Sequence, residues 1–478
     1  MRIRTFLLAA SLTTTGLLAL PATTASAAPA RHADDFNGDG YRDLAVGMPE
    51  KTIGGKKGAG AVLVTFGSAS GLTEKRVYVT QNSSGVPGTA ETDDSFGASL
   101  SSGDLDGDGY ADLLVTSEGE SVGELSLRGG VTVLWGGPTP LRSGADLADP
   151  GSYDQQFFGF DTAVGDFVGD ASPDVVVSDA SGLWLFQGGF DRAFLTKPTR
   201  LNPRGANNDV GHGHLAVGDF TGGGKDELAV TVPGTTVVYG VGADSSGDPS
   251  EFRDRAALAG GTTSAAGDLD GDGRDDLAVG LPNPDLYDNG LTDPSRAAGY
   301  VMVYRGTRGA EATGGLSRTR RTYHQGTAGV PGDNEATDQF GASLSIADIT
   351  GDGRAELAVG VSYESLDGHF RTGDVLVLRG SANGPTTAAA KRFSQSTAGV
   401  PGAAQFNDEF GAQLRLADFN RDGKADLAVT APGKDRMSGA VWQLRGTASG
   451  PSASGSKVFR AADYGLAAGS RLGKSLLA

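Results

Sequence analysis

Four aspartates in the segment DLDGDGYAD, residues 104–112, have a spacing that suits a metal ion. They occupy positions 1, 3, 5 and 9 of the segment, as Asp104, Asp106, Asp108 and Asp112. Carboxylates this close repel one another unless a cation lies among them. Oxygen ligands at this density suit Ca²⁺, which takes six to eight of them. Gly109 has no Cβ, so the loop can turn there and direct the carbonyl of Tyr110 at the ion.

The pattern recurs seven times, at intervals of 49 to 80 residues. The copies begin at Asp35, Asp104, Asp166, Asp219, Asp268, Asp348 and Asp418. Repeats of this period are typical of blade-type architectures, in which one ring of repeats forms one domain. We number the loops one to seven in chain order.

The seven loops differ in how many oxygen ligands they keep. Five are expected to bind Ca²⁺, through the position 1, 3, 5 and 9 side chains and the position 7 carbonyl: Asp35, Asn37, Asp39, Tyr41 and Asp43; Asp104, Asp106, Asp108, Tyr110 and Asp112; Asp268, Asp270, Asp272, Arg274 and Asp276; Asp348, Thr350, Asp352, Arg354 and Glu356; Asp418, Asn420, Asp422, Lys424 and Asp426. Loop three keeps Asp166, Asp170 and Asp174 and is expected to be weak. Loop four has Gly223 at position 5 and is not expected to form a strong site. The alternative for any one loop is a polar turn without metal.

An EF-hand is excluded by position 12 and by the flanking pattern. An EF-hand needs a bidentate glutamate at position 12 and helices on both sides. Position 12 is valine in every copy: Val46, Val115, Val177, Val230, Val279, Val359 and Val429. The residues around the loops alternate with a period of two, which predicts strands.

The elements that must position these loops are short strands. Each loop is followed by a run such as DLLVT, where Leu113 and Val115 predict a strand with one buried face. Segments such as FGASL, residues 96–100, precede the loops, and third and fourth apolar runs follow. Each acidic loop is therefore expected to connect the first two strands of a four-stranded blade.

The two chain ends complement each other. Loop one has no Phe-Gly segment before it, whereas LGKSLLA, Leu472–Ala478, matches the Phe-Gly segments but has no loop after it. We therefore predict that the C-terminal strand completes the first blade and closes the ring.

Composition restricts the class of protein. The chain has 478 residues, no cysteine and a formal net charge of −18, which argues against nucleic acid and anionic membrane surfaces as main partners. Residues 1–27 resemble a secretory signal: Arg2 and Arg4 precede a mostly apolar run that ends near Ala25-Ser26-Ala27. The remainder, residues 28–478, is expected to be one secreted, monomeric domain with no transmembrane segment. Without disulfides, metal-binding loops are the obvious staples.

The order of Phe-Gly segment, strand, DxDGDG loop and strand resembles the FG-GAP repeat family, which includes the propeller of integrin alpha subunits and many secreted bacterial proteins. The resemblance covers residues 33 to the end. It implies an all-β, seven-bladed β-propeller of four-stranded blades, with calcium in the hairpins between first and second strands. It also implies that ligands bind on the face opposite these hairpins.

On that opposite face, long loops carry aromatic candidates for ligand contact: Tyr287, Tyr363, His369 and Phe370. Loops on a rigid scaffold commonly carry function. The alternative is that these side chains pack over their own loops.

Two further motifs have more than one interpretation. Gly119–Gly123 matches GxSxG, but a nucleophile elbow needs a strand–turn–helix context that is absent from the pattern here. His212 and His214 form an HxH pair, which suits either a transition metal or a decayed blade.

The sequence therefore predicts a calcium-stabilised propeller that acts as an extracellular binding or adhesion module for a glycan or protein ligand. The alternative is a polysaccharide hydrolase or lyase with its site on the loop-rich face or in the central channel. No catalytic constellation is visible in the sequence, so an enzyme is not the expected class.

Overall fold

The second strand of each blade carries buried residues on both of its faces. In strand β5 (Asp112–Ser117), Leu113 and Val115 pack with residues of the first blade, whereas Leu114 packs with residues of the third. The expectation of one buried face was therefore wrong. Each blade lies between two others, so both faces of its sheet are covered.

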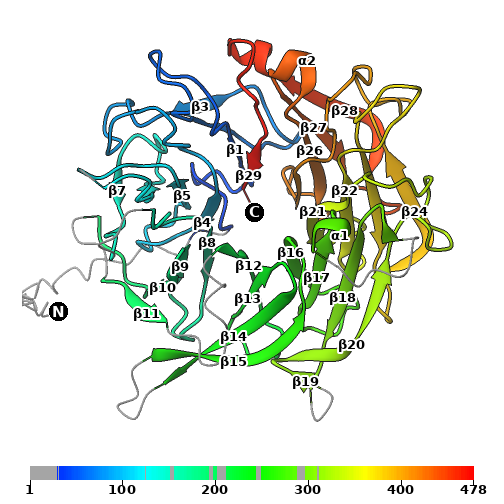
Figure 1. The fold of residues 1–478 in the computed structure, drawn as a ribbon, viewed down its shortest axis with the longest axis horizontal. Helices are drawn as coiled ribbons and strands as arrows, with labels where there is room; N and C mark the ends of the chain where they lie inside the picture. The colour runs from blue at the N-terminus through cyan, green and yellow to red at the C-terminus, as the bar shows by residue number, and fades with distance from the viewer. Residues whose placement is uncertain are drawn as a thin grey trace, which may run out of the picture.

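The computed structural model describes residues 30, 32–123, 125–150, 155–192, 197–201, 212–243, 249–287, 296–308 and 312–477. The predicted signal peptide, residues 1–27, lies outside them. Within the described part of the chain, seven antiparallel sheets form a ring of blades (Figure 1). This confirms the all-β, seven-bladed propeller.

From the centre of the ring outward, the strands of each blade follow one another in chain order, except for β29 (Ser475–Leu476) in blade one and β19 (Ala312–Thr313) in blade five. They are β29 (Ser475–Leu476), β1 (Leu44–Gly47), β2 (Val62–Thr65) and β3 (Arg76–Val79) in blade one; β4 (Leu100–Gly103), β5, β6 (Gly130–Leu134) and β7 (Gly144–Asp146) in blade two; β8 (Thr162–Gly165), β9 (Asp174–Asp179), β10 (Gly182–Phe186) and β11 (Thr199–Leu201) in blade three; β12 (His214–Gly218), β13 (Glu227–Val232), β14 (Thr235–Ala243) and β15 (Pro249–Ala259) in blade four; β16 (Thr263–Gly267), β17 (Asp276–Leu281), β18 (Tyr300–Gly306), β20 (Leu316–Tyr323) and β19 (Ala312–Thr313) in blade five; β21 (Phe340–Ala347), β22 (Glu356–Val361), β23 (Asp374–Arg379) and β24 (Thr386–Phe393) in blade six; β25 (Leu414–Ala417), β26 (Asp426–Ala431), β27 (Ala440–Arg445) and β28 (Ser452–Arg460) in blade seven. The described residues also contain short helical turns: α1 (Pro284–Tyr287) after β17, α2 (Lys434–Met437) after β26 and the 3₁₀ turn η3 (Ala461–Tyr464) after β28.

Blade five differs from the expected four strands. The two-residue strand β19 pairs with β20 and makes this sheet five-stranded. The Phe-Gly segments also differ from the expected strands in part. In blade six the strand begins at Phe340, whereas in blade two Phe96 precedes β4 and forms only an isolated bridge with Gly60 of the previous blade.

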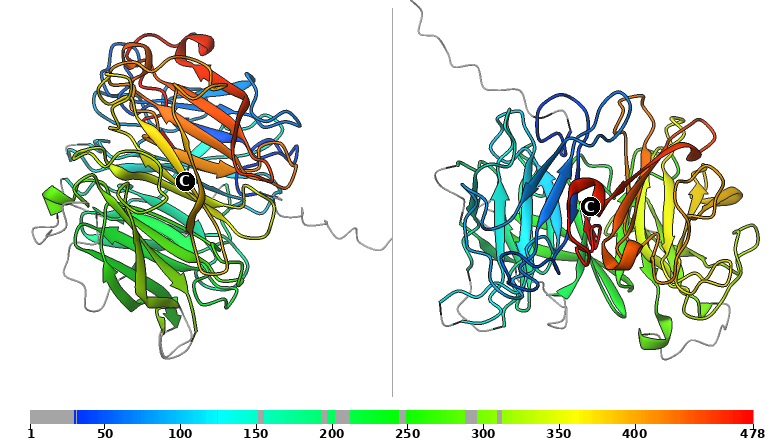
Figure 2. Two further views of the ribbon diagram at one scale, coloured as in Figure 1. Left: turned by 90° about the vertical axis from the view of Figure 1, so that its right-hand side faces the viewer. Right: turned by 90° about the horizontal axis from the view of Figure 1, so that it is seen from above.

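The C-terminal strand closes the ring, as predicted. Strand β29 pairs with β1 through Val46–Leu476 and Gly47–Ser475. Leu472 is fully buried and forms the same bridge with Gly439 of blade seven that the phenylalanines form elsewhere. Figure 2 shows the red C-terminal segment between the dark blue first blade and the orange seventh blade.

Strand order places the loops on two faces. The acidic loops join first and second strands, so they share one face of the ring. Segments that join second to third strands, or one blade to the next, share the other, for example 48–61, 80–99, 362–373 and 394–413. We call this second face the opposite face.

Candidate metal loops and ligand-binding surfaces

The position 1 carboxylate organises each acidic loop. In loop two, Asp104 accepts the backbone N–H groups of Asp108 and Gly109, both at 3.1 Å. Gly109 has φ 91°, the left-handed conformation that the sequence predicted for the turn. The backbone itself therefore holds the carboxylates close together.

The carboxylates of loops two and five converge. Within the described residues, Asp104, Asp106 and Asp108 place ligand oxygens within 4.8 Å of one another, as do Asp268, Asp270 and Asp272. Burial raises the pKa of Asp108, and the neighbouring charge of Asp106 adds to this. An all-oxygen, negatively charged donor set of this kind fits a hard cation such as Ca²⁺.

Loop shape alone does not separate strong from weak loops. In loop four, Asp219 accepts the N–H groups of Gly223 and Gly224 at 2.8 and 2.7 Å, although position 5 has no carboxylate. Asp166 of loop three accepts equivalent bonds. The difference between the loops is therefore their charge and oxygen count, and the metal assignments of all predicted ligands remain predictions.

The position 9 acid has a structural role that the sequence did not reveal. Asp112 is fully buried and accepts the N–H groups of Leu105 at 3.0 Å and Gly136 at 2.8 Å. It therefore ties the loop to the end of the third strand. Burial raises the pKa of Asp112 to about 7, and Asp106 and Asp108 contribute to the rise. Asp43, Asp276 and Glu356 make corresponding bonds to Gly67, Gly306 and Gly380.

Position 2 of every loop is an apolar anchor that sequence reasoning missed. The seven side chains are 0–2 % exposed: Phe36, Leu105, Phe167, Phe220, Leu269, Ile349 and Phe419. Their recurrence beside the first aspartate was the available signal. Each anchor buries the start of its loop in the packing between blades.

Arginines also reach the acidic loops. Arg305 donates to Asp270, Arg379 to Asp352 at 3.1 Å and Arg445 to Asp422 at 2.8 Å. All three lie at the end of a third strand and are followed by glycine, a repeated Arg-Gly signal in blades five to seven. In loop two the cation comes from another blade, because Arg192 pairs with Asp106 and Asp108. These guanidinium groups offset part of the loop charge.

The aromatic candidates on the opposite face lie mainly on the β22–β23 loop. Tyr363 is half-buried beneath Arg371, whose guanidinium carbon lies 3.9 Å from the ring centre. His369 is exposed, and Phe370 keeps 45 % of its surface exposed. The side chain of Tyr287 lies outside the described residues.

The structure adds Phe406 to this surface. Its ring lies 5.9 Å from that of Phe370, and it is 62 % exposed. Phe406 belongs to the segment between blades six and seven, so linear sequence could not place the two rings together. We call Tyr363, His369, Phe370, Arg371 and Phe406 the blade-six aromatic patch.

The two ambiguous motifs meet in one pocket of about 330 Å³. Gly119 of the GxSxG match and His212 of the HxH pair line it, together with Glu118, Phe157 and Phe160. His212 packs edge-on against Phe160 at 5.1 Å, whereas His214 lies 3.6 Å from a carboxylate oxygen of Asp161. Within the described residues, neither histidine belongs to a three-ligand cluster. The pocket lies on the opposite face, apart from the blade-six aromatic patch.

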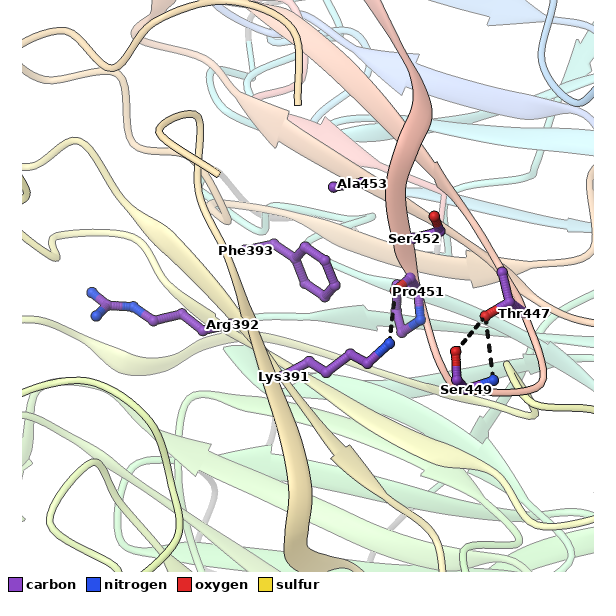
Figure 3. A pocket seen from close by; sticks show the side chains of 8 residues that line it. All are labelled: Lys391, Arg392, Phe393, Thr447, Ser449, Pro451, Ser452 and Ala453. Carbon is purple, nitrogen blue, oxygen red and sulfur yellow. Dashed lines mark hydrogen bonds between the residues drawn. The ribbon is translucent and has the colours of Figure 1, made fainter. Parts of the chain in front are cut away.

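A larger open groove of about 670 Å³ lies between the outer strands of blades six and seven (Figure 3). Phe393 and Thr447 line it, and Lys391 donates to the carbonyl of Pro451 across it at 3.2 Å. Lys457 makes the same kind of bond to Leu72 at the next junction. The groove is therefore part of a repeated seam between blades.

Comparison with known proteins agrees with this architecture. The FG-GAP repeat family model matches residues 32–65, 96–134, 260–303, 340–378 and 410–442. These segments contain the loops of blades one, two, five, six and seven. They are the five loops that retain the fuller ligand sets.

Relatives match over short segments. Phosphatidylinositol-glycan-specific phospholipase D of Rattus norvegicus is 32% identical over 116 residues, which is 23% of this chain and 14% of the relative. Integrin alpha-8 of Mus musculus is 39% identical over 90 residues, 19% of this chain and 8% of the relative. The chain thus spans less than a sixth of the length of either.

A solved structure on recognition of non-reducing terminal N-acetylglucosamine by an Agrocybe aegerita lectin covers 91% of this chain and 94% of its own, with 13% identity and a TM-score of 0.49. At that score, the similarity does not bear on ligand or function. Among the described residues, no helix is long and apolar enough to cross a membrane.

Proposed function

We propose that this chain, a seven-bladed β-propeller that carries FG-GAP repeats, is a secreted, calcium-stabilised binding module for an extracellular glycan or protein. The blade-six aromatic patch is the observation that carries the proposal. Two phenylalanine rings, Phe370 and Phe406, stay exposed on a rigid scaffold beside Arg371. Exposed apolar patches rimmed by polar residues commonly mark interaction sites.

Arg371 gives the patch polarity as well as apolar area. Its guanidinium group stacks on Tyr363 at 3.9 Å and lies 4.9 Å from the ring centre of Phe370. Stacking restricts the arginine, so less side-chain entropy is lost when it donates to a ligand oxygen. Aromatic rings beside a fixed donor suit either a sugar face or a peptide segment.

Calcium would act as a staple on the far side of the ring. We infer about five sites, in loops one, two, five, six and seven, held by the ligands given above. The ion would neutralise the clustered carboxylates and fix the hairpins between first and second strands. Extracellular calcium is millimolar, which is enough for the weaker class of such sites.

Binding arrays in calcium buffer test the function. Immobilised glycans and extracellular-matrix proteins are probed with the wild type and with a Phe370→Ser/Phe406→Ser double variant. The proposal expects retention on a defined ligand and at least a tenfold weaker signal for the double variant. Val122→Ser, which removes an exposed apolar side chain from a different blade, is the matched control.

The same arrays test the alternative that the protein is an enzyme. A hydrolase or lyase would release new sugar ends from a polysaccharide, whereas a binding module would retain the glycan intact. Retention with no product, lost in the double variant, supports the binding module. Product release that the double variant leaves unchanged would contradict it.

A further inference from the structure

The opposite face carries a repeated junction between blades that differs in charge from copy to copy. At each of three junctions a buried aspartate precedes a Phe-Gly segment: Asp94, Asp338 and Asp408. The carbonyl of that aspartate accepts the N–H of Gly119, Tyr363 or Gly433, respectively, at 3.0 to 3.2 Å. The next residue in each case, Glu120, Glu364 or Lys434, is therefore structurally equivalent.

The junction between blades six and seven contains its own cation. The ammonium group of Lys434 lies 3.0 Å from Asp408 and 2.5 Å from the carbonyl oxygen of Ala403. Both side chains are almost fully buried, and Gln395 also donates to Asp408, at 2.8 Å. The ammonium group thus shows where a positive charge fits in this junction.

The junction between blades five and six contains a cation from a different position. Here the equivalent residue is Glu364, which accepts from Gln325 at 2.6 Å and pairs with Arg392 at 3.0 Å. Arg392 comes from the outer strand β24 and faces Leu376 of β23. The same guanidinium group also pairs with the buried Asp374, so one internal cation offsets part of the charge of the acids at this junction.

The junction between blades one and two has acids in both places and lacks the equivalent cation. Gln81 donates to Glu120 at 2.5 Å, as Gln325 does to Glu364. In blade two, Thr132 of the third strand pairs with Asp146 of the fourth. In blade six, the equivalent Leu376 pairs with Arg392. Asp146 therefore occupies the position that Arg392 has in blade six. Burial raises the pKa of Glu120 to about 7, and Asp94, Glu91 and Asp146 add to the rise.

Two buried oxygen atoms at this junction have no hydrogen-bond partner within the described residues. One is the amide oxygen of Gln81, which is orphaned in the two equivalent glutamines as well. The other is the hydroxyl of Ser117, which is 3 % exposed and stands where the other two junctions have Val361 and Ala431. Ser117 lies two residues after Val115, on the strand face that packs against blade one. A buried hydroxyl without a partner needs an explanation, and a bound ion is one that also accounts for the acids beside it.

We propose that the junction between blades one and two binds a hard divalent cation through Asp94, Glu120, the amide oxygen of Gln81 and the hydroxyl of Ser117. The charge of Lys56 lowers the pKa of Asp94, but by less than the charge of Glu91 or of Asp93 raises it. The site would be separate from the acidic loops, because it lies on the opposite face. The bound ion would supply positive charge at this junction, as the ammonium group of Lys434 does between blades six and seven.

Native mass spectrometry of the purified full chain in CaCl₂ counts the ions per molecule. The expected result is one ion fewer for Glu120→Gln than for the wild type. Glu118→Gln, which removes the same charge two residues away, should leave the count unchanged. Lys434→Glu recreates the acid pair beside Asp408 and should gain one ion.

An unchanged count in Glu120→Gln would overturn the proposal. If that variant does not fold, Ser117→Val, which copies Val361, is measured instead and should bind calcium at this site at least tenfold more weakly. A second outcome would also overturn the proposal. If Glu120→Gln melts higher than the wild type, and by the same amount in calcium as in chelator, a proton shared by the two acids neutralises them and no ion is needed.

Discussion

At the residue scale, the acidic loops differ in charge but share the same backbone hydrogen bonds. Asp104 and Asp219 accept the same two backbone bonds, although only loop two has carboxylates at positions 3 and 5. Removing one of those carboxylates should therefore change metal affinity and leave the loop folded. Bound metal stabilises only the native state, by about 4 kcal/mol per site at a thousandfold excess over Kd.

The variant Asp108→Asn tests this at one position. Its amide oxygen can still accept the N–H of Tyr110, so the loop should keep its shape. We expect the calcium-dependent rise in melting temperature to shrink and the melting temperature in chelator to stay the same or increase. Asp170→Asn, at the same position of the weak loop three, should have little effect. Equal calcium-dependent rises in both variants and the wild type would refute the assignment.

A second residue-scale prediction concerns pH. Burial raises the pKa of Asp338 to about 7, and Glu364 adds to the rise. Because this pKa is higher in the folded than in the unfolded chain, the folded state binds the extra proton, and the stability it contributes is lost as pH rises from about 4 to about 7. The free energy of unfolding of Asp338→Asn minus that of the wild type should therefore be larger at pH 8 than at pH 5. Urea unfolding in chelator measures both, and a pH-independent difference would contradict the cause given.

The acid positions in each loop could be read from sequence because they repeat at fixed spacing. The buried ties of Asp112 to Leu105 and Gly136 could not, because they depend on where the third strand ends. The same limit applies to the blade-six aromatic patch. Phe370 was visible as a candidate, but Phe406 and Arg371 join it through folding of separate loops.

At the element scale, period-two alternation predicted the strands, and the match of Leu472 to the Phe-Gly segments predicted the closing strand. The alternation could not show that both faces are buried, since that depends on neighbouring blades. It also could not show β19, because the pairing of Ala312–Thr313 with β20 is a local hairpin without a periodic signal.

Removing the closing strand should destabilise the whole ring. Deletion of residues 472–478 removes the pairing of β29 with β1 and the buried side chains of Leu472, Leu476 and Leu477. We expect a large fall in melting temperature, measured by circular dichroism. Leu472→Ala alone should cost about 2–5 kcal/mol, as is usual for a buried leucine. Lys474→Ala, an exposed change in the same segment, is the control, and an unchanged melting temperature in the deletion would contradict ring closure.

At the scale of the whole molecule, the chain forms one ring with acidic loops on one face and variable loops on the other. No cysteine is available to hold this ring together. The ring must therefore be held together by packing between blades, by the closing strand and, in our proposal, by bound metal. We propose that ligand binding takes place on the face away from the acidic loops.

Thermal unfolding of the purified chain in millimolar calcium and in chelator tests this central claim most directly. Several loops that bind calcium only when folded should together raise the melting temperature by well over 10 °C, because each occupied site adds to the free energy of unfolding. Magnesium at the same ionic strength should give a smaller rise, since it prefers a smaller octahedral site. Superimposable melting curves in calcium and in chelator would show that the acidic loops are polar turns without metal.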